Sequence, residues 1–364
     1  MRIFYASDTT PNSAFQSNIW RYNLLLPLID LGHDVIEFEY DLTETFRHLN
    51  AQNPKNISFI QRNRPVVSAE LVRQIKKAHA EKSVDLFFSY FYDACVLPET
   101  IDEIKTIGIT TVNWFCNGAH QLHLVSEISP HYDWCLVPEK FRLDDYRAMG
   151  AHPIYTQEAA NPHIYKPYDV AREFDVTFVG QAYGDRAGFI RQMADAGIDI
   201  RVWGKNWLKY SDHQRSCINW ISRKIHNKRS DLSLPSSIIG GILSDEDLIR
   251  MYSRSKINLG FSSCGSPQPD QKRILQVRLR DFEVPMSGGF YMVEYMDELA
   301  EFYRIGEEIV CYDAVKDLID KIQYYLKNER EREKIRRAGY ERCRRDHTWQ
   351  KRFEAAFHHM GLNH

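Results

Sequence analysis

The sequence predicts an α/β protein built from two successive doubly wound parallel sheets. Short apolar runs of strand type alternate with segments whose apolar residues recur at helical spacing, a pattern typical of parallel α/β sheets. The alternation stops at residues 158–167, which contain two prolines, and starts again at residue 175. A chain of 364 residues with 43% hydrophobic content can bury two cores, so we expect two domains.

The first half opens with an apolar strand at residues 1–7 and a polar loop at residues 8–17. Residues 19–31 have helical spacing and end at Gly32, a residue that suits a helix C-terminus. Further strands are predicted at residues 35–40, 84–90, 110–115 and 132–137, and further helices at residues 69–80, 98–107 and 141–149. This strand–helix–strand order predicts parallel pairing.

The second half repeats the pattern. Strands are predicted at residues 175–180, 198–204, 256–261 and 290–293, and helices at residues 189–196, 245–253, 315–326 and 329–345. Ser244 is a predicted N-cap with Asp247 three residues later, and Asp313 is predicted to cap the helix at 315–326. The charges at residues 329–345 are interpreted as a solvated helix face.

Composition excludes several classes of protein. A formal net charge of −2 gives no reason to expect a nucleic-acid partner. The seven cysteines form no C-x-x-C pair, which argues against a zinc ribbon or a disulfide framework and favours reduced thiols in the cytoplasm. The chain begins with a strand rather than a signal peptide, and no apolar run approaches the roughly 20 residues of a membrane span.

Residues 278–294 are predicted to form a short helix, a glycine turn and a buried strand. Pro285 has no amide hydrogen, so we place it in the first turn of the helix. Residues 280–283 would then lie at the helix N-terminus, where free N–H groups and the dipole favour phosphate. Arg278 and Arg280 add positive charge that matches phosphate geometry. The alternative is a surface connection whose charges bind no ligand.

Several short pieces follow one another at a specific spacing. They are Arg280-Asp281-Phe282-Glu283, Gly288-Gly289, Glu294, Gly306-Glu307-Glu308, Tyr324-Tyr325-Leu326, Ala338-Gly339-Tyr340 and His347-Thr348-Trp349. In this order they closely resemble the C-terminal half of group 1 glycosyltransferases of the spore-maturation CgeB-like type. The resemblance covers about residues 173–352 and is looser before them.

The two α/β halves and this resemblance together imply the GT-B architecture, in which two Rossmann-like domains face each other across a cleft. We expect an acceptor-side domain at residues 1–165 and a nucleotide-sugar-binding domain at residues 166–347. A helix at about residues 348–364 is expected to pack back on the first domain. Ligands bind beyond the carboxyl ends of parallel strands, so the loops there should line the cleft. Those loops follow Ser7, Phe115, Gly180, Trp203 and Phe261.

The resemblance implies a glycosyltransferase that moves a sugar from a nucleotide-diphosphate donor to a glycan, a lipid-linked intermediate or a protein. Gly180, Arg186, Arg278 and Arg280 are the candidates for the diphosphate, and Arg186 and Arg280 would stabilise the leaving group in catalysis. Lys272 and Arg273 are further candidates, and Glu283 would accept hydrogen bonds from the ribose hydroxyls. The alternatives are that Arg186 pairs at a helix start and that Glu283 pairs with Arg280.

The acceptor side is expected to include Asp8, Asn117, His120 and His123, which follow predicted strands. CgeB-like relatives often have acidic residues where Asn117-Gly118 stands, so no carboxylate base occupies that place. His120 is the candidate base because histidine titrates near neutrality. No base stands out, so retention and inversion both stay open.

Two further departures from the resemblance concern the donor. Many group 1 enzymes have a second glutamate eight positions before Glu283, and Leu275 stands there in this chain. The glycine-rich turn that many GT-B enzymes have after the first strand is replaced by Ser7-Asp8-Thr9-Thr10-Pro11. The contacts to the donor sugar are therefore left open, and so are any contacts from the first half to the phosphate.

No D-x-D motif follows a strand, so we expect neither a metal nor another cofactor. Residues 205–229 combine aromatic and basic side chains, which suits anionic lipid headgroups at the inner face of a membrane or a phosphate-bearing acceptor; a surface insertion is the alternative. Two rival functions are a nucleotide-sugar 2-epimerase and a non-catalytic partner that binds nucleotide sugar.

Overall fold

The computed structural model describes residues 1–8, 17–212, 232–265 and 273–362. The chain divides into two compact units, each treated by itself below. Unit 1 consists of Met1–Asn161 and Trp349–His364, and unit 2 consists of Pro162–Thr348. In the described ranges, no helix has the length and apolar character needed to cross a membrane.

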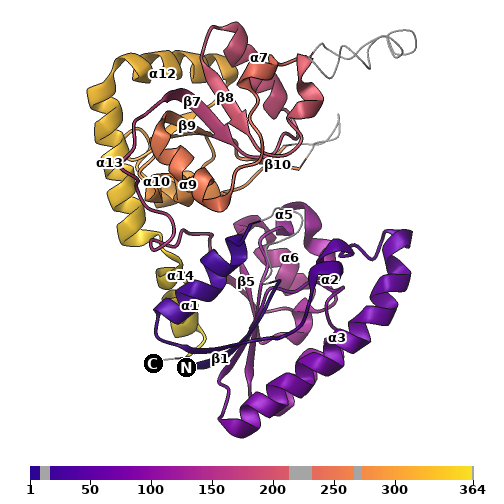
Figure 1. Ribbon diagram of the computed structural model, residues 1–364. Coiled ribbons are helices and arrows are strands. Elements are labelled where there is room, and N and C mark those ends of the chain that lie inside the picture. The colour runs from indigo at the N-terminus through magenta and orange to yellow at the C-terminus, as the bar shows by residue number, and fades with distance from the viewer. Residues whose placement is uncertain (9–16, 213–231, 266–272, 363–364) are drawn as a thin grey trace, which may run out of the picture. The chain divides into compact units, whose positions relative to one another are not determined.

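Unit 1 contains a six-stranded sheet with the order β2-β1-β3-β4-β5-β6, and all neighbouring strands are parallel (Figure 1). The strands are β1 (Arg2–Ala6), β2 (Asp34–Glu37), β3 (Leu86–Ser89), β4 (Thr110–Trp114), β5 (Trp134–Val137) and β6 (Pro153–Tyr155). The short strand β6 was not predicted. Because β1 lies between β2 and β3, the winding reverses at β1 and β3, where such sheets bind ligands beyond the carboxyl ends of the strands.

The helices of unit 1 lie between these strands, except for the last one. They are η1 (Arg21–Leu25), α1 (Leu26–Asp30), α2 (Thr43–Arg47), α3 (Pro54–Glu81), α4 (Pro98–Thr106), α5 (Gly118–Gln121), η2 (Leu122–Leu124), η3 (Ser129–His131), η4 (Lys140–Arg142), α6 (Leu143–Ala148) and α14 (Trp349–His359). The predicted helix at residues 69–80 is only the second part of α3, which continues through Pro65. Its buried face runs over Ile60, Val67, Ser68, Leu71, Ile75 and Ala78, and the apolar packing of that face holds the helix together across the proline.

The C-terminal helix α14 packs into unit 1 and lies beside α1 (Figure 1). The ring of Trp349 meets that of Trp114 edge-on, with centroids 5.1 Å apart. Phe353 meets Phe88 of β3 in the same manner at 5.6 Å. Rings of this size bury a large apolar area, so α14 is an integral part of the core of unit 1.

Unit 2 contains a five-stranded sheet with the order β13-β12-β9-β7-β8, again with parallel neighbours. The strands are β7 (Phe174–Val179), β8 (Ile200–Trp203), β9 (Ser255–Gly260), β12 (Tyr291–Glu294) and β13 (Val310–Tyr312). A separate antiparallel pair is formed by β10 (Ser263–Cys264) and β11 (Ile274–Leu275). The winding reverses at β7 and β9, so the loops after Val179 and Gly260 mark the expected ligand position in this sheet.

The helices of unit 2 include α13, which contains the charged segment predicted as a helix at residues 329–345. They are α7 (Arg186–Asp195), η5 (Leu208–Tyr210), η6 (Ser236–Ile238), α9 (Asp245–Arg254), α10 (Leu279–Met286), α11 (Leu299–Phe302), α12 (Val315–Lys327) and α13 (Glu329–Asp346). The predicted cap of α9 is confirmed, since the Ser244 side chain accepts from the Asp247 N–H at 3.1 Å.

Two predictions about helix ends are wrong. The N-cap of α12 is Ala314, and the Asp313 N–H instead donates to the Asp317 carboxylate at 3.1 Å. Pro285 lies inside α10 rather than in its first turn, because the helix already begins at Leu279. The first turn therefore contains Arg280 and Asp281, and the proline comes one turn after them.

Helix α13 packs against α10. The Cys343 thiol donates to the Phe282 carbonyl at 3.2 Å. A Cβ at Gly339 would lie 2.2 Å from the Glu308 carbonyl oxygen, so only glycine permits this close approach. The Ala-Gly-Tyr and Gly-Glu-Glu pieces of the sequence pattern are therefore parts of one contact, which fixes the position of α10.

Candidate functional site

Three arginine side chains gather at the point of unit 2 where the winding of the sheet reverses. Arg186 is the first residue of α7, which follows β7. Arg278 is the N-cap residue of α10, and Arg280 is the second residue of that helix. All three are residues predicted from the sequence to bind the diphosphate.

Arg186 is buried and is held by neutral partners. Its Nη1 donates to the Gln181 carbonyl at 2.9 Å, and its Nη2 donates to the Tyr183 hydroxyl at 2.6 Å. The guanidinium lies 3.7 Å from the centroid of the Tyr183 ring and 5.2 Å from that of Phe178. Burial, together with the nearby positive charges of Arg280 and Arg278, lowers the pKa of Arg186 to about 10. Burial therefore disfavours the charged form of Arg186, and a bound anion would stabilise that form.

Arg278 shares the same tyrosine. Its Nη2 donates to the Tyr183 hydroxyl at 3.1 Å and to the Ser263 carbonyl at 2.9 Å. The hydroxyl of Tyr183 therefore links two guanidinium groups from different helices. The sequence analysis missed Tyr183, although its position three residues before Arg186 could have suggested a partner for that arginine.

Arg280 lies against Gly180, the residue that follows β7. Its guanidinium carbon is 5.3 Å from the centroid of the Phe178 ring, a cation–π distance. A Cβ at Gly180 would lie 2.6 Å from Cζ of Phe178 and 3.1 Å from Nη2 of Arg280. Glycine at this position therefore makes room for the arginine. Burial opposes the charge of Arg280, but the pKa is raised because Tyr252, Tyr291 and Glu283 stabilise the cation.

All three arginines keep hydrogen-bonding capacity. Among the residues that the structure describes, the buried Nε atoms of Arg186, Arg278 and Arg280 have no hydrogen-bond partner. Arg186 and Arg278 donate to carbonyls and to the Tyr183 hydroxyl, and Arg186 and Arg280 lie against aromatic rings. Such a group of cations is suited to bind an anion with several oxygens, and arginine matches phosphate in particular.

Asp281 fixes the backbone of this site rather than binding a ligand. Its carboxylate accepts from the Arg278 N–H at 2.8 Å and from the Tyr291 hydroxyl at 2.6 Å. Burial raises the pKa of Asp281 to about 6. The sequence analysis treated Asp281 as an isolated acid, but a carboxylate at the third position of a helix is a capping signal that could have identified it.

Glu283, the predicted ribose ligand, is buried one turn into α10. It interacts electrostatically with Arg280 and raises the pKa of that arginine, so the two residues lie close to each other. The sequence analysis had offered ribose binding and pairing with Arg280 as alternatives. The structure brings Glu283 and Arg280 together, and the ribose role stays a prediction.

The other two residues predicted to bind the donor are Arg273 and Lys272. Arg273 is engaged by acids: its Nη1 lies 2.7 Å from Oε1 of Glu294, and its Nη2 lies 3.1 Å from Oδ2 of Asp185. Lys272 falls outside the described residues. The same holds for most of the basic and aromatic segment at 205–229, of which the structure describes residues 205–212.

In unit 1, the predicted acceptor residues lie at the carboxyl edge of the sheet. Asp8 is buried just after β1. Asn117 precedes α5, and its side chain interacts with the buried Tyr92 hydroxyl. His120 and His123 are both exposed, on α5 and η2. The acceptor-side role of these residues stays a prediction.

A buried acid that the sequence analysis missed lies in the same region. Glu139 follows β5, and its Oε2 lies 3.0 Å from the place where a Cβ of Gly118 would stand. Burial raises the pKa of Glu139 to about 7, while the N–H groups of Ala119 and Gly118 oppose that rise. Arg142 donates to the Ala119 carbonyl at 2.6 Å. Glu139 and Arg142 therefore both contact the backbone at the start of α5, the helix that contains His120.

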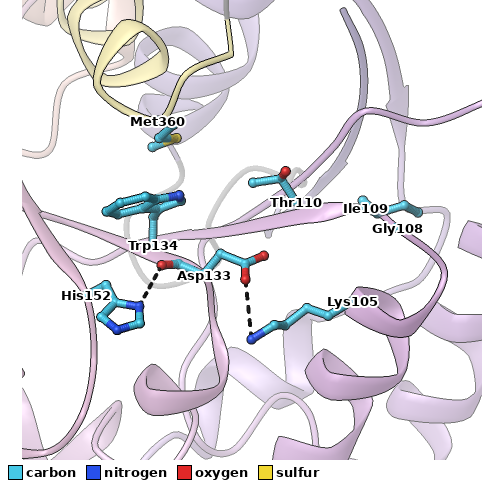
Figure 2. Close-up of a pocket in the computed structure, with 8 residues that line it drawn as sticks. All are labelled: Lys105, Gly108, Ile109, Thr110, Asp133, Trp134, His152 and Met360. Atoms are coloured by element: carbon cyan, nitrogen blue, oxygen red, sulfur yellow. Dashed lines mark hydrogen bonds and ion pairs between the residues drawn. The ribbon is translucent and has the colours of Figure 1, made fainter.

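A pocket of about 570 Å³ opens at the opposite, amino-terminal edge of the unit 1 sheet. Figure 2 shows Trp134 beneath Met360, and Lys105 pointing toward Asp133 at 3.3 Å. Parallel α/β sheets bind ligands at the other edge, and the two charged residues of this pocket satisfy each other. We therefore do not assign the pocket to the proposed chemistry.

Comparison with known proteins gives a family match and a fold. Residues 186–358 match the profile of the family described as glycosyl transferase-like. A search of curated protein sequences finds no match. The finer resemblance, to the CgeB-like spore-maturation type, is not tested by these matches and stays a prediction.

Solved structures resemble the whole chain at low sequence identity. Sucrose-phosphate synthase from Thermosynechococcus elongatus is 13% identical with a TM-score of 0.60, covering 100% of this chain and 99% of its own. HepE from Anabaena in complex with UDP and glucose is 10% identical with a TM-score of 0.60, covering 100% of both chains. A Listeria monocytogenes protein assigned as a UDP-N-acetylglucosamine 2-epimerase is 12% identical with a TM-score of 0.53, covering 100% and 97%. These likenesses confirm the predicted GT-B fold.

Proposed function

We propose that this chain, which matches the glycosyl transferase-like family over residues 186–358 and has the GT-B fold, is a glycosyltransferase that uses a nucleotide-diphosphate sugar. The observation that carries the proposal is the group formed by Arg186, Arg278 and Arg280 at the switch point of the unit 2 sheet. Arg186 and Arg278 donate to neutral acceptors, and Arg280 lies against the ring of Phe178, so this group offers positive charge to a diphosphate.

The chemistry of glycosyl transfer explains why such a group accelerates the reaction. As the bond between the sugar and the diphosphate breaks, negative charge grows on the leaving phosphate. Cations that are already in place stabilise this charge more strongly in the transition state than in the bound donor, and that difference raises the rate. Arg186 and Arg280 are the residues we assign to this step, with Arg278 as a further phosphate ligand.

In this proposal the protein also binds the ribose of the donor. Glu283 is buried one turn from Arg280, so its carboxylate would accept hydrogen bonds from the ribose hydroxyls next to the diphosphate. UDP is the first nucleoside diphosphate to test, because HepE structures were determined with UDP and with UDP-glucose.

The remaining parts of the proposal follow the sequence analysis. Unit 1 would supply the acceptor side, with His120 as the candidate base and Asp8, Asn117 and His123 near the acceptor. The acceptor would be a glycan, a lipid-linked intermediate or a protein, and the protein would work in the cytoplasm or at the inner face of the membrane. The arginine group would replace a metal ion in stabilising the leaving group, so we expect activity to survive EDTA.

The proposal is tested by incubating the protein with UDP-sugars and following the release of UDP. Slow hydrolysis of one donor in wild type, lost in an Arg186→Gln/Arg280→Gln variant that still folds, is the expected result. An Arg250→Gln variant is the matched control, because Arg250 lies on the exposed face of α9 and pairs with Glu246 at 2.7 Å. Absence of UDP release from every donor would contradict the proposal.

A nucleotide-sugar 2-epimerase is the second candidate, favoured by the Listeria monocytogenes neighbour. An epimerase needs the same grips on diphosphate and ribose, but its sugar keeps the nucleotide. Interconversion of UDP-N-acetylglucosamine and its 2-epimer without net UDP release would favour this function over transfer.

A further inference from the structure

We propose that Arg273 is a positioning residue. By pairing with the carboxylates of Asp185 and Glu294, it prevents them from pairing with the phosphate-binding arginines. This inference rests on the proposed function, because it assumes that Arg186, Arg278 and Arg280 bind a diphosphate. It differs from the sequence prediction, in which Arg273 itself was a donor ligand.

The contacts of Arg273 show a guanidinium shared between two acids. One nitrogen, Nη1, lies 2.7 Å from Oε1 of Glu294, and the other, Nη2, lies 3.1 Å from Oδ2 of Asp185. The Glu294 side chain is only 6% exposed, whereas those of Arg273 and Asp185 are 36% and 38% exposed. A buried carboxylate that lost its arginine would seek another cation, because an unpaired buried charge is costly.

Both acids lie beside the phosphate-binding arginines. Asp185 directly precedes Arg186 and is the N-cap residue of α7. Glu294 ends β12, and its Oε2 accepts from the Ser262 N–H at 3.2 Å. The next residue, Ser263, supplies the carbonyl that accepts from Arg278. Asp185 is therefore next to Arg186 in the chain, and Glu294 binds Ser262, the neighbour of the residue that accepts from Arg278.

A buried tyrosine lies near the same charged groups. Tyr312 ends β13, and burial raises the pKa of its hydroxyl. The negative charges of Glu294 and Asp185 raise this pKa further, whereas Arg186 and Arg273 lower it. All four charged groups thus act on one phenol, so Arg186 lies within electrostatic range of both acids.

Among the described residues of this region the formal charges balance, so their pairing decides which charges a phosphate meets. The arginines are Arg186, Arg273, Arg278 and Arg280, and the acids are Asp185, Asp281, Glu283 and Glu294. Because Arg273 takes two of the acids, Arg186 and Arg278 are left with neutral acceptors. Without Arg273 the region would have one more negative than positive charge, and the two released acids would compete with phosphate for Arg186.

The test measures UDP binding by isothermal titration calorimetry in four proteins. These are wild type, R273Q, the triple variant R273Q/D185N/E294Q, and R201Q as a matched control. Arg201 pairs with Asp199 at 3.0 Å on β8, so R201Q also removes an arginine–aspartate pair from unit 2. Thermal unfolding of each protein establishes that it folds, and R273Q/D185N, which keeps buried Glu294 unchanged, serves as a second rescue variant.

We expect R273Q to bind UDP at least fivefold more weakly than wild type, and the triple variant to recover to within about twofold of wild type. R273Q/D185N should recover in part, and R201Q should bind like wild type. The inference is overturned if R273Q binds UDP normally, or if neither rescue variant recovers, since Arg273 would then contact the phosphate itself. If wild type binds no nucleoside diphosphate, the proposed function fails and the inference fails with it.

Discussion

The hydroxyl of Tyr183 accepts a hydrogen bond from Nη2 of Arg186 at 2.6 Å, and the guanidinium lies 3.7 Å from the centroid of the same ring. A second arginine, Arg278, donates to that hydroxyl at 3.1 Å. A carboxylate in this place would orient the arginines equally well but would neutralise them. A tyrosine orients them and leaves their charge for a ligand, which is what a diphosphate site requires.

The variant Tyr183→Phe removes this shared acceptor and keeps the ring. Hydrogen bonds to charged groups contribute ~1.5–3 kcal/mol each, so we expect UDP affinity to fall about tenfold or more. Calorimetric titration of UDP measures the change. Tyr324→Phe is the matched control, because that hydroxyl binds Glu331 on the exposed surface of α12 and α13. Unchanged affinity in Tyr183→Phe would remove the hydroxyl from the account.

The variant Gly180→Ala should lose donor binding for a steric reason. Its Cβ would lie 2.6 Å from Phe178 and 3.1 Å from the Arg280 guanidinium, so the arginine would have to move. We expect at least a tenfold loss of UDP affinity. Gly241→Ala is the control, since a Cβ there meets nothing within 4 Å. Equal affinity in the two variants would show that the closeness of Gly180 and Arg280 does not matter for binding.

The variant Glu283→Ala tests the ribose contact. Loss of a charged acceptor from ribose hydroxyls is expected to cost at least tenfold in kcat/KM, because each such hydrogen bond contributes ~1.5–3 kcal/mol. Kinetics with the donor found in the hydrolysis screen measure this, and Glu246→Gln on the exposed face of α9 is the control. Wild-type kcat/KM in Glu283→Ala would remove Glu283 from the site.

Glu139 should give the stability of the protein a distinctive dependence on pH. Its folded-state pKa is raised from the usual 4.5 to about 7 by burial, so the folded protein holds the proton more tightly than the unfolded chain. The sign follows from linkage: the contribution to the free energy of unfolding is fully present below about pH 4.5 and is lost as pH rises through about 7. Its full size is of the order of 3 kcal/mol.

Denaturant unfolding of wild type and Glu139→Gln between pH 4 and 8 measures this contribution. The difference in free energy between the two proteins should change across this window, with wild type losing stability relative to the variant as pH rises. Glu354→Gln, at an exposed position of α14 in the same unit, should follow wild type at every pH. Parallel curves for Glu139→Gln and wild type would contradict the shifted pKa.

Much of the fold could be predicted because apolar patterning decides it. Most strands of both sheets and the short helix, glycine turn and strand at residues 278–294 were predicted from such patterns, whereas the three-residue strands β6 and β13 were not. The misses have local causes. Pro65 hid the first half of α3, whose stability comes from a buried face rather than from local propensity. Pro285 was placed by its usual preference for the first turn, whereas the packing of α13 against α10 fixes it one turn later.

The site was predictable in its residue types but not in its pairings. The sequence indicated Arg186, Arg278 and Arg280; the structure connects the first two through Tyr183 and places Arg186 and Arg280 against the ring of Phe178. It could not show that Arg273 pairs with Asp185 and Glu294, because those residues are far apart in the chain and meet only after the sheet forms. Glu139 was missed for the same reason: the backbone that it contacts belongs to the loop after a different strand.

The central claim, that three arginines of unit 2 bind a diphosphate, is tested most directly by calorimetric titration of UDP and of uridine into wild type and an Arg278→Gln/Arg280→Gln variant. The account predicts that wild type binds UDP at least a hundredfold more tightly than uridine, that added salt weakens the binding of UDP, and that the variant loses this preference. Equal affinities for UDP and uridine in wild type, or an unchanged preference for UDP in the folded variant, would contradict it.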